Sequence, residues 1–132
     1  MKVKPAAYIL LGFTIAWLLT KLLNWIEGVL VIGLIPFIGF AHELLHLISS
    51  LIVGASHKFT FNGLLIGFKI VSKSVEDFIA IALSPQIISI LLLILYAILS
   101  SSIALALAVI HIAISVEDLS KITKYLLQHI IN

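Results

Sequence analysis

A run of 39 residues without Asp, Glu, Lys or Arg, from Phe78 to Val116, constrains the fold of this chain most strongly. One membrane span needs only about 20 apolar residues, so the run predicts two transmembrane helices that reverse at Ser100-Ser101-Ser102. The composition agrees, because 62% of the residues are hydrophobic and only 11% are charged, whereas soluble domains carry about 25% charged residues. With a mean hydropathy of +1.27, the chain is expected to be an integral membrane protein.

The apolar segments predict an all-α membrane protein with four transmembrane helices in one domain of residues 1–132, over residues 5–26, 28–53, 76–99 and 103–128. The basic start and apolar centre of the first helix are also typical of a secretory signal. No small-residue cleavage site follows them, so we expect a retained helix, with a cleavable signal as the alternative. In this arrangement most lysines fall on one side of the membrane, and the positive-inside bias then places both termini in the cytoplasm.

The loop between the second and third helices shows strand-like alternation and predicts a short amphipathic β-hairpin over residues 57–71, at the membrane surface. Asn62-Gly63 is a strong hairpin signal, and as a two-residue loop it would pair Phe61 with Leu64. An exposed strand edge can bind an extended peptide by strand addition. The alternative is a hairpin that only connects two helices.

Charged and ionisable side chains interrupt the predicted second helix at one place, His42-Glu43-Leu44-Leu45-His46. Residues four apart lie on one face of a helix, so both imidazoles can bind one metal ion, with Glu43 beside it. This is the H-E-x-x-H pattern of zinc metalloproteases, in which the glutamate takes a proton from the attacking water. The alternative is that the three side chains only satisfy one another inside a helix bundle.

A catalytic zinc needs a third protein ligand, and Asp118 is the best candidate. It lies about 22 Å along the fourth helix, while His42 and His46 lie about 21 and 27 Å along the second, at 1.5 Å per residue. Both helices run inward, so these depths coincide. His111 lies only about 12 Å along the same helix; it could be a group behind the ligands, a proton relay or a replacement ligand. Glu117 is better explained by pairing with Lys121, four residues on.

Ser84-Pro85 is expected to break the third helix at membrane depth. Such a break can line a cavity or bind substrate backbone, or it can serve packing alone. The sequence leaves both roles open.

These features together resemble the family of small membrane proteins called putative zincin peptidases, over roughly Gly28 to Lys121. More distantly they resemble site-2 proteases, the zinc intramembrane proteases, which have a glycine where this chain has Leu119 after the aspartate. The resemblance implies zinc bound by three residues, His42, His46 and Asp118. It also implies that Glu43 is the base.

The expected function is therefore that of a zinc metallopeptidase acting on a membrane protein or peptide within or next to the bilayer. A metal transporter and a zinc-binding scaffold without activity are the alternatives, and iron would also suit two histidines and a carboxylate. With no cysteine, disulfides and cysteine metal sites are excluded. The net charge of +2 without a basic aromatic patch makes nucleic acid an unexpected partner.

Overall fold

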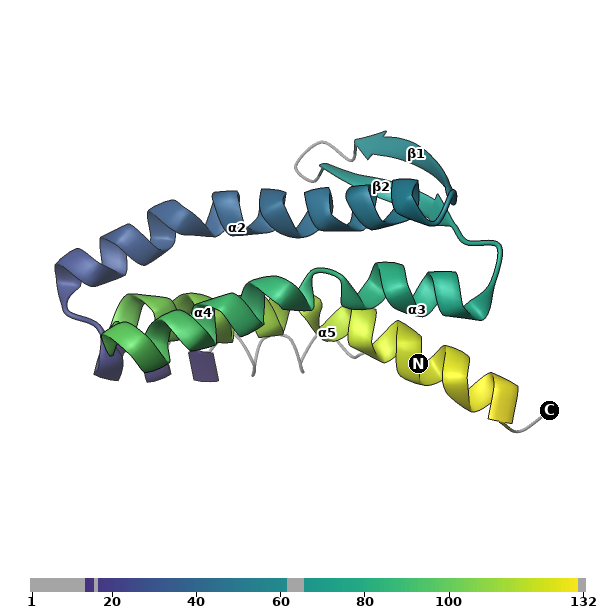
Figure 1. Ribbon diagram of the computed structural model, residues 1–132. Helices are drawn as coiled ribbons and strands as arrows, with labels where there is room; N and C mark the ends of the chain where they lie inside the picture. Colours follow the sequence, from purple (N-terminus) through teal and green to yellow (C-terminus); the bar gives the residue numbers. More distant parts are fainter. Residues whose placement is uncertain (1–13, 16, 62–65, 131–132) are drawn as a thin grey trace.

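The computed structural model describes residues 14, 15, 17–61 and 66–130 (Figure 1). Its elements are α2 (Trp25–Ile52), β1 (Ser56–Phe61), β2 (Ile66–Val71), α3 (Val75–Leu83), α4 (Gln86–Leu99) and α5 (Ser102–Ile130). The predicted combination of long helices and one hairpin is confirmed.

Three segments among the described residues are long and apolar enough to cross a membrane: Trp25–Ile52, Val75–Leu99 and Ser102–Gln128. Much of the predicted first span, residues 5–26, lies outside the described residues, although residues 17–22 are helical. A count of four spans therefore stays a prediction.

The start of α2 corrects the predicted boundary between the first two helices, because Glu27 and Gly28, which we expected to form a short turn there, lie inside the helix. Asn24 caps the helix instead: its side-chain Oδ1 accepts the Glu27 N–H at 2.9 Å, and Glu27 Oε2 accepts the Asn24 N–H at 2.9 Å. This reciprocal capping box satisfies two backbone donors that a helix start otherwise leaves unpaired. A charged residue followed by glycine was mistaken for a turn because the cap lies three residues earlier.

At its other end α2 leads directly into the hairpin through Gly54, whose φ of +68° is left-handed. The N–H of Gly54 reaches the Leu51 carbonyl, and the N–H of Ala55 reaches the Ser50 carbonyl at 2.8 Å. These two bonds form the helix end in which glycine is favoured after the cap. β1 therefore begins immediately beyond α2, on the side of the predicted site.

The hairpin exists, but its predicted register is wrong by two residues. Phe61 pairs with Ile66 rather than with Leu64, so four residues separate the strands. The predicted turn residues Asn62-Gly63 lie outside the described residues. Because side chains alternate with a period of two, a two-residue slip keeps the same alternation, and the pattern cannot distinguish the two registers.

Ser84-Pro85 separates α3 from α4, and Ser100, with a left-handed φ of 51°, ends α4 before α5 begins. Both interruptions were predicted. The helix α5 contacts α2, α3 and α4. Its small buried residues Ala104, Ala106 and Ala108 let the neighbouring helices approach closely. Large apolar side chains of α2 such as Phe37 and Phe40 are exposed, as expected of a surface in contact with lipid.

Candidate metal centre

Two buried histidines lie one turn apart on α2. The residues His42 and His46 are only 3% and 9% exposed, and their Nε2 atoms are 3.2 Å apart. A spacing of four residues places both rings on the face of α2 that meets α3 and α5. The two nitrogens therefore point at one place.

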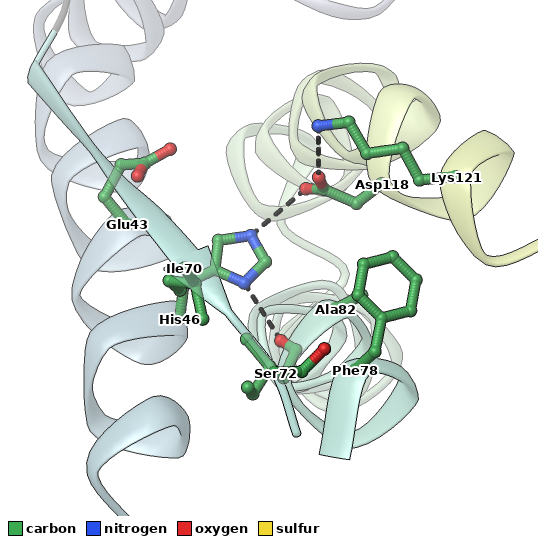
Figure 2. A pocket seen from close by; sticks show the side chains of 9 residues that line it. Glu43, His46, Ile70, Ser72, Phe78, Ala82, Asp118 and Lys121 are labelled. Carbon is green, nitrogen blue, oxygen red and sulfur yellow. Dashed lines mark hydrogen bonds and ion pairs between the residues drawn. The ribbon is translucent and has the colours of Figure 1, made fainter. Parts of the chain in front are cut away.

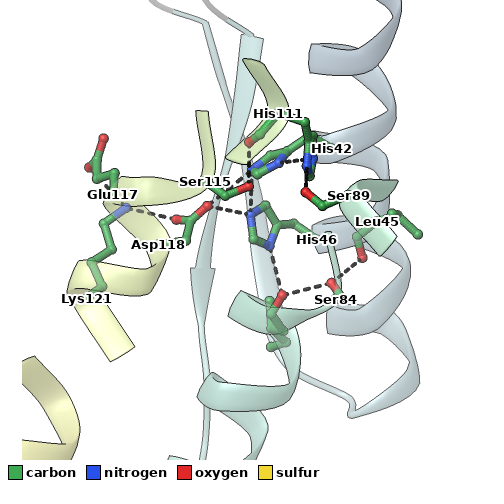
Figure 3. Close-up of polar contacts among 11 residues, drawn as sticks. His42, Leu45, His46, Ser84, Ser89, His111, Ser115, Glu117, Asp118 and Lys121 are labelled. Carbon is green, nitrogen blue, oxygen red and sulfur yellow. Dashed lines mark hydrogen bonds and ion pairs between the residues drawn. The ribbon is translucent and has the colours of Figure 1, made fainter. Parts of the chain in front are cut away.

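Asp118 reaches the same place from α5. Its Oδ2 lies 3.1 Å from Nε2 of His42 and 3.1 Å from Nε2 of His46 (Figure 3). Its other oxygen, Oδ1, accepts a bond from Lys121 Nζ at 3.4 Å. The structure thus brings together the three predicted ligands as a group that can hold a metal ion.

The chemistry of this group fits zinc. Tetrahedral zinc with ligands at about 2.0–2.1 Å separates its ligand atoms by about 3.3 Å, close to the 3.1 and 3.2 Å found here. His46 Nδ1 lies 2.9 Å from the Ile81 carbonyl, which can only accept, so Nδ1 carries a proton and the neutral ring presents the lone pair of Nε2. A lone pair facing a carboxylate oxygen is repulsive unless a positive centre lies between them. A cation satisfies all three atoms at once.

His111 lies behind His42, on the side away from Asp118. Its Nε2 is 3.1 Å from Nδ1 of His42, and its Nδ1 is 2.7 Å from Oγ of Ser89 on α4. The ring is fully buried. Of the three roles left open by the sequence, this geometry favours a group behind the ligands, because His111 meets the nitrogen of His42 that faces away from the cluster.

A cavity of about 320 Å³ opens beside the cluster and is lined by Glu43, His46 and Asp118. Figure 2 shows Glu43 on α2 and Asp118 on α5 on either side of the His46 ring. Ile70, Ser72 and Phe78 complete much of the wall, so β2 and α3 also border the site. The cavity has room for further atoms next to the Glu43 carboxylate and the His46 ring.

Glu117 takes no part in the cluster. Its Oε1 pairs with Lys121 Nζ at 3.1 Å, as the spacing of four residues predicted, and its side chain is 67% exposed. The same lysine also contacts Asp118.

Two partners of the histidines were not found from the sequence. Ser89 gave a weak signal as the one serine within the apolar α4. The Ile81 carbonyl belongs to the backbone and gives no side-chain signal; the only indication is Pro85, four residues later.

The sequence model of a family described as putative zincin peptidase matches residues 35–130. Because this match covers most of the chain and all of the clustered residues, the chain belongs to that family. No curated protein and no solved structure matches it. The more distant likeness to site-2 proteases stays an expectation.

Proposed function

From membership of this family, we propose that the protein is a multi-pass membrane zinc metallopeptidase that hydrolyses a peptide bond within or next to the bilayer. The observation that carries the proposal is the convergence of His42, His46 and Asp118 beside a cavity that Glu43 also lines. The three would hold zinc through Nε2, Nε2 and Oδ2. We further propose that both termini are cytoplasmic, as the lysine distribution favours.

Bound zinc would supply a Lewis acid that polarises the scissile carbonyl and acidifies water. Within the cavity, Glu43 accepts the proton that the attacking water loses as its oxygen bonds to the scissile carbon. The same carboxyl then gives this proton to the amine nitrogen as the C–N bond breaks. Lys121 holds Asp118 through Oδ1 and so keeps Oδ2 directed at the two histidines.

A substrate helix has to unwind before cleavage, because its carbonyls are hydrogen-bonded within the helix. The hairpin is suited to hold such a segment. Ile70 and Ser72, at the end of β2 and just beyond it, line the same cavity as Glu43. Strand edges bind extended peptides through main-chain bonds. We therefore propose that the substrate is an unwound segment of a membrane protein or peptide lying along the hairpin.

Metal transport fits the arrangement less well. A transported ion needs polar groups along a path to both sides of the membrane. Within the described residues, the buried polar side chains behind His42 are His111 and Ser89. The buried core beyond them is apolar and consists of Val31, Ala106 and Leu107. They provide no ligands for an ion leaving the cluster.

Replacing Glu43 by Gln tests the proposal. The wild type and Glu43→Gln are reconstituted in vesicles with pooled synthetic transmembrane peptides, and the products are identified by mass spectrometry. We expect the wild type to cleave, and the variant to keep its zinc but lose at least about 100-fold in rate, since general-base catalysis contributes 10²–10⁴-fold.

Glu76→Gln is the matched control, because Glu76 is an exposed carboxylate at the start of α3 and does not line the cavity. It should cleave like the wild type. A wild type that binds zinc and cleaves no peptide would contradict the peptidase and favour the scaffold. Equal cleavage by Glu43→Gln and wild type would remove Glu43 from the mechanism.

A further inference from the structure

Pro85 leaves one backbone carbonyl of α3 without its usual partner. In an α-helix each carbonyl accepts the N–H four residues later, which for Ile81 is residue 85. Proline has no N–H, so this bond cannot form. The helix amide that remains within reach, the N–H of Ser84, lies 3.4 Å from the Ile81 oxygen and is a weak substitute.

Two side chains form hydrogen bonds with the freed carbonyl instead. His46 Nδ1 donates to Ile81 O at 2.9 Å, and the Ser84 hydroxyl lies 2.8 Å from the same oxygen (Figure 3). Ile81 is only 5% exposed. An unpaired carbonyl away from water is costly, so a proline inside a membrane helix requires such replacement donors. Here one of the donors is a residue of the metal cluster.

We propose that Pro85 is a positioning residue for the metal ligand His46: by removing the competing amide, it reserves the Ile81 carbonyl for the imidazole. The inference rests on the proposed zinc site. The carbonyl holds the proton on Nδ1 and fixes the ring, and Nε2 is thereby directed at His42 and Asp118. Partners of this kind orient metal-binding histidines and raise their basicity.

An N–H at position 85 would compete for the same carbonyl. Completing the bond to Ile81 O would draw α3 and α4 toward one continuous helix and turn the carbonyl back along the helix axis. His46 would then lose the acceptor that fixes its ring. The break therefore affects the site through a single backbone atom, the Ile81 oxygen.

Pro36 provides a control for the removal of a helix proline, at an exposed position whereas Pro85 is fully buried. It is also a proline within a membrane-spanning helix, α2, but α2 continues through it. The carbonyl that Pro36 frees belongs to Ile32, whose side chain is 68% exposed, and neither residue lines the cavity beside the cluster. Removing Pro36 changes a helix proline without changing a histidine partner.

The first experiment measures the zinc dissociation constant in detergent by competition with a chelating dye, for wild type, Pro85→Ala and Pro36→Ala. Loss of a partner behind a metal ligand typically weakens binding by about 10–100-fold. We expect this loss in Pro85→Ala and unchanged affinity in Pro36→Ala. Equal affinity of all three proteins would overturn the inference.

A second measurement needs no proline variant and decides the matter if Pro85→Ala fails to fold. In zinc-loaded wild type labelled with ¹⁵N-histidine, the His46 signal should show Nδ1 protonated and Nε2 bound to metal. Nδ1 bound to metal would overturn the inference. If the wild type binds no zinc at all, the proposed function is wrong. If it binds zinc but gives either contradicting result, only the role of Pro85 is wrong, so the two outcomes are distinguishable.

Discussion

His111 should control how tightly zinc binds without being a ligand. The ring is fully buried, and with His42 Nε2 turned to the metal, His42 Nδ1–H donates to His111 Nε2 while His111 Nδ1–H donates to Ser89 Oγ. We predict that His111→Ala weakens zinc affinity about 10–100-fold but keeps one zinc per chain, measured by chelator competition and metal analysis.

Ser115→Ala is the control for this prediction, because Ser115 is equally buried on α5 but, among the described residues, its hydroxyl donates to the His111 carbonyl of its own helix. It should bind zinc like the wild type. Loss of zinc from His111→Ala to the extent seen for Asp118→Ala would make His111 a ligand and contradict the assignment.

At the level of residues, the sequence predicted the side chains of the cluster better than their partners. His42 and His46 follow from a spacing of four, and Asp118 from equal helix depth. His111, which holds the far nitrogen of His42, had this role among its expected ones. The partner of the far nitrogen of His46 could not be predicted, since it depends on which backbone atom of α3 faces α2. Every residue has a backbone carbonyl, so the sequence does not indicate that the carbonyl of Ile81 is the one that binds His46.

At the level of elements, close packing of α5 depends on its alanines. Ala106 is fully buried against Val31 and Leu107. We predict that Ala106→Leu destabilises the fold by about 1–3 kcal/mol, because added methylene groups overpack a tight interface. Thermal unfolding in detergent measures the effect.

Ala97→Leu makes the same change at an exposed position of α4 and should alter stability by no more than about 0.5 kcal/mol. Similar melting temperatures for both leucine variants would contradict the tight packing of α5.

The ends of the helices and strands were predictable where the composition changes sharply. They were less predictable where local hydrogen bonds determine the residue at which an element begins or ends. The serine-rich reversal and the break at Ser84-Pro85 were both found. The start of α2 was placed three residues late because a capping box at Asn24 overrides the appearance of a turn at Glu27-Gly28. The hairpin register depends on its loop. A slip of two residues leaves the alternation of apolar and polar side chains unchanged, so the pattern does not reveal the slip.

At the level of the whole molecule, three long apolar segments and the hairpin surround one polar cluster within the described residues. Each ligand comes from a helix that is otherwise suited to lipid, and the buried polar groups among the described residues gather around this cluster: His42, His46, Ser50, Ser89, His111 and Ser115. Ionisable groups at membrane depth are costly and usually functional. The arrangement is consistent with a fold organised around a metal ion.

Zinc content is the most direct test of this account. The purified protein in detergent is analysed for metal as wild type, His46→Ala, Asp118→Ala and Glu43→Gln. We predict about one zinc per chain in wild type and Glu43→Gln, and loss of zinc from the other two, because each removes one of three ligands. A wild type without metal, or equal zinc in all four proteins, would contradict the proposed centre.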